Sequence, residues 1–135
     1  MRKIDIEKFC DDLLNNYKKR GIDDFELAIS ESKVLSVKTR NVKLENIESS
    51  SGIGISLNLI IGKKQATLKA NNLDDINVVD FLDQGKFMAE ASPEDPFAGL
   101  PDKEDYAKNI QDLDLEDKSK LDKKSLIDLA LQAEN

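Results

Sequence analysis

The chain of 135 residues contains no histidine, no tryptophan and a single cysteine, Cys10. Zinc sites in proteins normally use histidine or cysteine ligands, so this chain cannot make one by itself. One cysteine also excludes an internal disulfide, which fits a reducing compartment. A catalytic thiol needs a neighbouring base, and no histidine is present to serve as one. We therefore interpret Cys10 as a small hydrophobic residue on a helix face.

Long hydrophobic runs are also missing, since no apolar stretch approaches the roughly 20 residues that span a bilayer. The N-terminus turns acidic at Asp5 and lacks the apolar region of a signal peptide. The net charge of −7 opposes attraction to phosphate backbones and anionic lipids. The only basic triplet, residues 18–20, closes a predicted helix, where cations favour the helix dipole. We expect a cytoplasmic protein with no direct nucleic-acid partner and no membrane partner.

Residues 52–70 carry the clearest pattern and predict a β-hairpin. Gly62-Lys63 has the composition of a two-residue type II′ turn, and the returning strand over 65–70 alternates between apolar and polar residues. Before the turn, five apolar side chains occupy alternate positions and therefore share one face. They are Ile53, Ile55, Leu57, Leu59 and Ile61. We expect other elements to pack on this apolar face and shield it from water.

Two helices are predicted to supply the cover. The first spans 5–20, with Asp5 as N-cap and Gly21 as a left-handed C-cap residue. The second spans about 74–91, is capped by Asp74 or Asn72, and stops at Ser92-Pro93. Apolar residues at helical spacing form one stripe on each helix. These stripes are Phe9, Cys10, Leu13, Leu14 and Tyr17, then Val78, Phe81, Leu82, Gly85, Met88 and Ala89, where Gly85 lets the helix approach the sheet closely.

Two further strands are predicted at 24–30 and 34–39, joined by a tight turn at 31–33. Arg40-Asn41 is either a bulge or a turn, after which the chain continues as a strand to a polar break at 49–52. The sequence therefore predicts an α+β fold. Its sheet is mostly antiparallel and four-stranded, made of two hairpins, with helices packed on one face.

The C-terminal third differs in composition. All three prolines lie within 92–102, which predicts an irregular loop with Phe97 and Leu100 as anchors to the core. Acidic, weakly periodic sequence follows to 118, and a last helix begins near Asp122 without a stop signal. We expect an N-terminal α+β domain over 1–102, then a linker and the start of a further helix over 103–135, cut from a longer chain. Its apolar stripe predicts self-association through 119–135; the stripe is Leu126, Ile127, Ala130 and Leu131.

The sequence has only weak matches to motifs of catalytic, cofactor-binding or metal-binding sites. Gly52-Ile53-Gly54 lacks the third glycine of a dinucleotide-binding fingerprint. Residues 112–116 resemble the start of a calcium loop, but Asp117 and Lys123 stand where such a loop needs glycine and glutamate. Neighbouring acids such as Asp74-Asp75 are interpreted as caps and solvated faces. We therefore predict no catalytic, cofactor-binding or metal-binding residue in this chain.

Several segments together resemble the N-terminal part of the TldD/PmbA family. They are 26–30, 34–40, 44–48 and 52–57, followed by 112–115 and the end of the last helix at 132–134. The most specific match is residues 91–102, Ala-Ser-Pro-Glu-Asp-Pro-Phe-Ala-Gly-Leu-Pro-Asp. This segment is similar to the PmbA branch of the family, also called TldE.

The resemblance implies the N-terminal domain of a non-catalytic subunit that partners TldD in a cytoplasmic metalloprotease. In that family the His-Glu-x-x-x-His motif belongs to TldD, so zinc is expected only in a TldD-type partner. No position of this chain matches the motif. The family is also labelled a modulator of DNA gyrase, although nothing in this acidic sequence supports direct DNA contact. A second hypothesis stays open, in which the chain is a free-standing module that binds extended peptides through a sheet edge.

Overall fold

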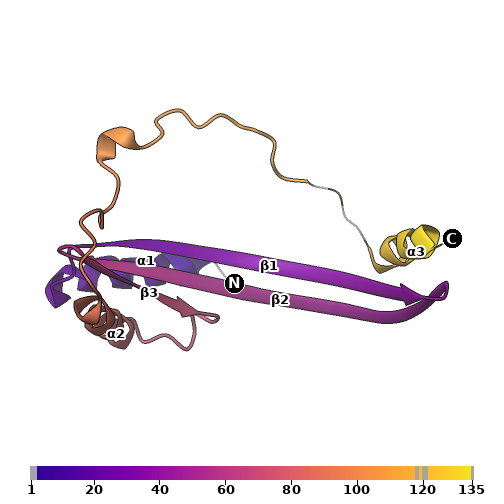
Figure 1. Ribbon diagram of the computed structural model, residues 1–135, viewed down its shortest axis with the longest axis horizontal. Helices are drawn as coiled ribbons and strands as arrows, with labels where there is room; N and C mark the ends of the chain where they lie inside the picture. The colour runs from indigo at the N-terminus through magenta and orange to yellow at the C-terminus, as the bar shows by residue number, and fades with distance from the viewer. Residues whose placement is uncertain (1–2, 118, 120–121, 135) are drawn as a thin grey trace. The chain divides into compact units, whose positions relative to one another are not determined.

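The fold was taken from a computed structural model, in which residues 3–117, 119 and 122–134 are described. Within these residues, three helices and three strands make an α+β fold, as predicted (Figure 1). They follow the order α1 (Lys3–Asn16), β1 (Asp24–Arg40), β2 (Lys43–Ile61), β3 (Lys64–Ala70), α2 (Val78–Ala91) and α3 (Lys123–Glu134), with short 3-10 turns η1 (Lys18–Arg20) and η2 (Lys103–Asp105). None of the described helices is both long enough and apolar enough to cross a membrane.

The chain forms two compact units. The first comprises Met1–Glu31 and Ile53–Tyr106, and the second comprises Ser32–Gly52 and Ala107–Asn135. The first unit contains both helices that pack on the sheet and the whole of β3. The boundary expected from the sequence, between 102 and 103, stays a prediction.

Over the described residues the sheet has three strands in the order β1-β2-β3, so the predicted four strands in two hairpins are wrong. The predicted turn at 31–33 and the predicted break at 49–52 both lie inside strands. The chain reverses at Asn41-Val42, within one residue of the bulge or turn predicted at Arg40-Asn41; φ there is +53° and +56°, the pair of positive values that a type I′ turn requires. Polar residues misled the prediction because a strand exposed to solvent accepts them without breaking.

The hairpin of β2 and β3 confirms the predicted register. Ile61 pairs with Lys64, so Gly62 and Lys63 form the two-residue turn. Gly62 has a φ of +58° and Lys63 has none in the positive range, as a type II′ turn requires. The predicted apolar face is the core face, because Ile55, Leu57 and Leu59 are buried and Ile53 and Ile61 pack against the same cluster.

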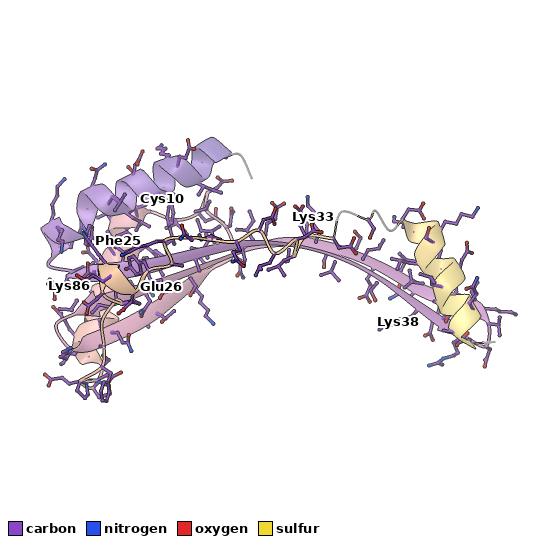
Figure 2. All side chains as sticks on the ribbon, turned by 90° about the horizontal axis from the view of Figure 1, so that it is seen from above. Cys10, Phe25, Glu26, Lys33, Lys38 and Lys86 are labelled. Atoms are coloured by element: carbon purple, nitrogen blue, oxygen red, sulfur yellow. The ribbon has the colours of Figure 1, made fainter. Side chains whose placement is uncertain are left out.

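Both N-terminal helices contribute to that core. Leu13 of α1 and Leu82 of α2 are fully buried beside the apolar residues of β2. At Gly85 an added Cβ would lie 2.2 Å from Leu59 Cδ1 and 2.4 Å from Leu68 Cδ1, which confirms the predicted close approach of α2. On β1, Phe25 packs against the core while its neighbour Glu26 is exposed, as alternation along a strand requires (Figure 2).

The α-helical part of the first helix has other bounds than predicted, although the predicted C-cap residue is the same. It starts at Lys3, so Asp5 lies within its first turn and is not the N-cap. The α-helix ends at Asn16 and tightens into η1, which is a common way to end a helix. The predicted C-cap is confirmed. Gly21 has a φ of +73° and its N–H donates to Lys18 O at 3.0 Å, while Ile22 N–H donates to Tyr17 O at 3.2 Å.

The second helix begins at Val78, four residues later than predicted. Its N-cap is Asn77, whose side chain accepts hydrogen bonds from the N–H groups of Val79 and Asp80. Neither predicted cap serves the helix, because the Asn72 side chain instead accepts the N–H of Asp74 at 3.1 Å in the preceding loop. The helix ends at Ala91 with Ser92 as its C-cap, at the predicted Ser92-Pro93 stop.

Several residues predicted to be buried are exposed. They are Leu14 of α1, Met88 of α2, and the two predicted loop anchors, Phe97 (91% exposed) and Leu100. Helices touch the sheet along a narrower strip than their apolar stripes, so residues at the edge of a stripe stay in solvent. Ala98 anchors the loop over 92–102, since it is buried and its carbonyl accepts a hydrogen bond from Lys63 Nζ at 3.2 Å.

The second unit contains the tip of the β1–β2 hairpin and α3. Asp122 precedes α3 as predicted, and its Oδ1 accepts the N–H of Ser125 at 2.8 Å. No described residue of α3 is buried, and the four residues of its predicted apolar face are half-buried. Glu134 Oε2 accepts the N–H of Val42 at 2.8 Å.

Candidate functional site

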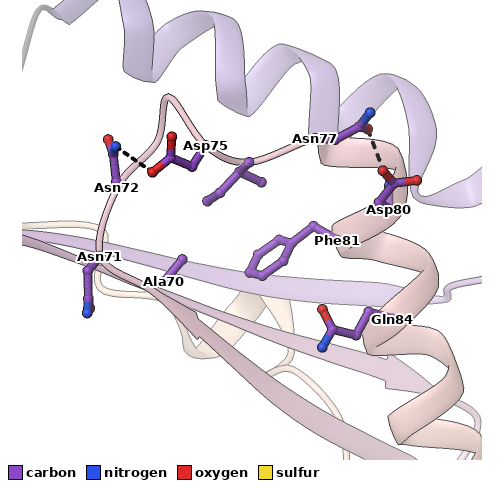
Figure 3. A pocket seen from close by; sticks show the side chains of 9 residues that line it. Ala70, Asn71, Asn72, Asp75, Asn77, Asp80, Phe81 and Gln84 are labelled. Carbon is purple, nitrogen blue, oxygen red and sulfur yellow. Dashed lines mark hydrogen bonds between the residues drawn. The ribbon is translucent and has the colours of Figure 1, made fainter.

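A cavity of about 430 Å³ lies where the end of β3, the loop over 71–77 and the first turns of α2 meet (Figure 3). Phe81 projects from α2 toward Ala70, at the end of β3. The apolar lining is Ala70, Ile76 and Phe81, and the polar lining is Asn71, Asn72, Asp75, Asn77, Asp80 and Gln84. The cavity therefore combines an apolar part with several carboxylates and amides.

The loop that forms one wall is held by its own side chains. Asn72 Nδ2 donates to Asp75 Oδ2 at 2.9 Å. Leu73 is buried in the core, and its carbonyl accepts the N–H of Ile76 at 3.1 Å. These hydrogen bonds within the loop hold its conformation. Such a pre-formed wall is typical of binding sites.

The opposite wall is the first turn of α2. Asn77 Oδ1 accepts the N–H groups of Val79 at 3.0 Å and Asp80 at 3.3 Å, so it is committed to capping. The Asp80 carboxylate has no hydrogen-bond or ion-pair partner among the described residues, and neither do the side-chain amides of Asn71 and Gln84. These three groups are available to a ligand.

The cavity adjoins a free strand edge. β3 is an outer strand of the sheet. Ile61 and Lys64 flank a two-residue turn and form a hydrogen-bonded pair, and such pairs alternate along an antiparallel ladder. The N–H and C=O groups of Gln65, Thr67 and Lys69 therefore point away from β2. No backbone partner for them occurs within the described part of the chain, and all three residues are exposed.

Helix α2 runs back beside β3. Its end lies near the start of the strand, because Lys64 Nζ donates to Glu90 O at 2.9 Å. Lys86 lies on the flank toward the end of the first helix, since a Cβ on Gly21 would be 3.6 Å from Lys86 Nζ. At 100° per residue, Phe81, Gln84 and Met88 occupy the opposite flank, beside the free edge of β3. Met88 is 42% exposed there.

Sequence reasoning missed this site. Its asparagines and aspartates were interpreted as a strand end and helix caps, and only their density over 71–80 hinted at more. The other candidates do not assemble into a site. Cys10 is half-buried, and no group of three or more histidine, cysteine, aspartate or glutamate side chains suited to a metal ion occurs among the described residues.

Both curated relatives described below are PmbA metalloproteases, although no family model matches the chain. The chain is 26% identical over 109 residues to a metalloprotease PmbA homolog of Haemophilus influenzae, an alignment covering 81% of this chain and 24% of that protein. It is 28% identical over 112 residues to metalloprotease PmbA of Escherichia coli O157:H7, covering 83% of this chain and 25% of that protein. The chain thus spans about a quarter of the length of these curated relatives. Both similarities support the resemblance of this chain to PmbA-like proteins.

Proposed function

We propose that this chain acts as the N-terminal domain of a PmbA-like, TldE-branch subunit in a cytoplasmic metalloprotease that cleaves peptides or proteins. The observation that carries the proposal is similarity to two PmbA metalloproteases over about four fifths of the chain. With no histidine and one cysteine, the chain does not supply a zinc ligand set. The proposal therefore assigns the zinc and the hydrolytic chemistry to a TldD-like subunit, and protein and peptide contacts to this chain.

Exposed apolar side chains supply a surface for such contacts. Within the second unit, Ile110 is 88% exposed, Leu115 is 86% exposed, and Leu113 between them is also exposed. Apolar surface gathered along one segment is typical of protein–protein contact sites. We assign residues 110–115 of the second unit to the contact with the TldD-like subunit or with the remainder of a PmbA-like protein.

The test is co-elution in size-exclusion chromatography after mixing with a full-length TldD-type subunit. Co-elution is expected, with zinc and peptidase activity remaining with the TldD-type subunit. The double variant Ile110→Ser/Leu115→Ser should weaken co-elution. Leu14→Ser is the matched control, because Leu14 is an exposed apolar residue of α1 and is not part of that segment. Separate elution of the two proteins at every concentration would contradict the proposal.

A second candidate function is a free-standing module that binds extended peptides through a sheet edge. The outward backbone groups of β3 favour it, because exposed edges can pair with an added strand. The two functions differ in their need for a partner. Peptide binding by the chain, without association with any TldD-type subunit, would favour the second.

A further inference from the structure

We infer that the free edge of β3 and the adjoining flank of α2 form a groove for an extended peptide, with a pocket for a basic side chain at its end. The inference deepens the proposed function and rests on it for the role of the peptide as a protease substrate. The groove itself belongs to the first unit alone and can be tested on the isolated chain.

Backbone hydrogen bonds would hold the peptide. The outward N–H and C=O groups of Gln65, Thr67 and Lys69 offer a ladder to a guest strand. In strand addition these main-chain bonds give affinity, and pockets for alternate side chains give specificity. Guest residues opposite Ala66, Leu68 and Ala70 place their side chains on the α2 side of the sheet, because paired residues share a face.

Helix α2 supplies the wall that these alternate side chains meet. Phe81 and Met88 present apolar surface and Gln84 presents an amide on the flank beside the edge. The guest side chain opposite Ala70 enters the cavity of about 430 Å³, because Ala70 lines that cavity. The groove thus has one defined pocket and a shallower apolar stretch.

The lining of the pocket selects the side chain that it receives. Phe81 and Ile76 offer apolar contact to an aliphatic stem, while Asp80 offers a carboxylate without a partner among the described residues and Asp75 offers a second one, which also accepts from Asn72. Lysine and arginine combine such a stem with a cationic head. Arginine fits best, because its guanidinium bonds to carboxylates and stacks on aromatic rings. The net charge of −7 adds long-range attraction for a basic peptide.

The probe is an acetylated, amidated and fluorescently labelled nonapeptide of alternating threonine and valine with one central arginine. We expect saturable binding to the 135-residue chain, measured by fluorescence anisotropy. Replacing the arginine by glutamate should weaken binding at least about tenfold, since it changes attraction to repulsion. N-methylation of the alternate amides that face β3 should remove binding, because it removes their hydrogen-bond donors.

Hydrogen exchange locates the guest strand without any mutation. The amides of Gln65, Thr67 and Lys69 should become protected when the peptide binds. Those of Ala66 and Leu68 already bond to β2 and should change little. Protection that appears elsewhere and leaves 65, 67 and 69 unchanged would overturn the strand-addition geometry.

Variants test the pocket and the edge separately. Asp80→Asn should weaken binding of the arginine peptide by about two- to fivefold, whereas Glu94→Gln removes the same charge from an exposed loop and should have no effect. Thr67→Pro should remove binding, since position 67 loses an outward N–H, while Thr67→Val should keep it. Equal binding of the arginine and glutamate peptides would overturn the basic pocket.

Failure of this inference can be told apart from failure of the proposed function. Co-elution with a TldD-type subunit, without any peptide binding to the chain, would remove the groove and leave the proposed function standing. Peptide binding with the expected protection pattern, without co-elution, would support the groove and contradict the proposed function.

Discussion

Gly85 sets the distance between α2 and the sheet. A Cβ at this position would fall within 2.4 Å of the side chains of Leu59 and Leu68, both of which are buried. Gly85→Ala should therefore destabilise the fold by about 1–3 kcal/mol through overpacking, even though alanine favours a helix. Urea unfolding of the two proteins measures the difference.

The matched control for this prediction is Gly52→Ala. At Gly52 the nearest atom to an added Cβ is Ser32 Oγ at 3.7 Å, an ordinary contact, and φ is not positive. The control should change the free energy of unfolding by less than about 1 kcal/mol. If the two alanine variants unfold alike, α2 does not approach the sheet as described.

Val42 is the residue whose backbone least suits its side chain. Its φ of +56° places a β-branched residue in the left-handed region, which costs about 1–2 kcal/mol. Val42→Gly relieves this strain and keeps the N–H that donates to Glu134. The hairpin tip should gain about 0.5–1 kcal/mol, measured as slower hydrogen exchange of amides over 32–52.

Val34→Gly is the control, and it should lower the stability of the hairpin that Val42→Gly raises. Val34 is 55% exposed, close to the 47% of Val42, but it lies inside β1 with an ordinary backbone. Glycine there should destabilise the hairpin, because it loses more conformational freedom on folding. Destabilisation of equal size at both positions would mean that the turn at 41–42 is not strained.

At the scale of elements, the start of α3 depends on one carboxylate. The backbone N–H of Ser125, and then its hydroxyl, bond to the charged form of Asp122 and lower its pKa below the ordinary value of 3.8. A lowered folded-state pKa means that this stabilisation is present above pH 3.8 and is lost as the pH falls through the folded pKa. The first turn of α3 should fray on acidification, seen in the Cα chemical shifts of residues 123–126.

Asp122→Asn separates the effect of the carboxylate charge from the effect of the helix cap. Asparagine caps helices about as well as aspartate but does not titrate. The variant should therefore keep the same helicity at the start of α3 from neutral to acid pH. If it loses helicity over the same pH range as the unmodified chain, other carboxylates cause the fraying and the role assigned to Asp122 is wrong.

Helix α3 as a whole should be the least protected of the three helices. None of its described residues is buried, whereas Leu57 and Leu59 of β2 are fully buried. Amides over 123–134 should therefore exchange well before those over 53–61, because exchange follows local stability. We also expect self-association through 119–135, detected as a concentration-dependent mass in sedimentation experiments and reduced by Leu126→Ser. If amides over 123–134 and over 53–61 are equally protected in the monomer, the prediction that α3 is weakly protected is wrong.

At the scale of the whole molecule, the purified chain should hold no stoichiometric zinc and should hydrolyse no peptide. Zinc sites draw on histidine and cysteine, of which the chain has none and one. Elemental analysis after dialysis measures the metal, and incubation with a labelled peptide measures the activity. One tightly held zinc ion per chain would overturn this assignment of roles between subunits.

Local signals in the sequence were enough to predict several parts of this fold. The alternation at 53–61 identified the core face, Gly62-Lys63 the turn, Gly21 the end of the first helix, and Ser92-Pro93 the end of α2. Each depends on backbone geometry within a few residues, where strand period, positive φ and proline sterics leave little choice. The hypothesis of a peptide-binding sheet edge also came from the sequence, and it stays a prediction.

Only the tertiary structure decided how long the strands are, which apolar residues are covered, and where the cavity lies. Polar residues at 31–33 and 49–52 continue a strand because they are exposed, and Met88 and Phe97 are exposed because none of the described elements covers them. The cavity lies beside the first turns of α2, which is capped by Asn77 and not by Asn72 or Asp74, and Asp80 and Phe81 line it together with Ala70 at the end of β3. These features depend on contacts between segments distant in the sequence, which local periodicity does not encode.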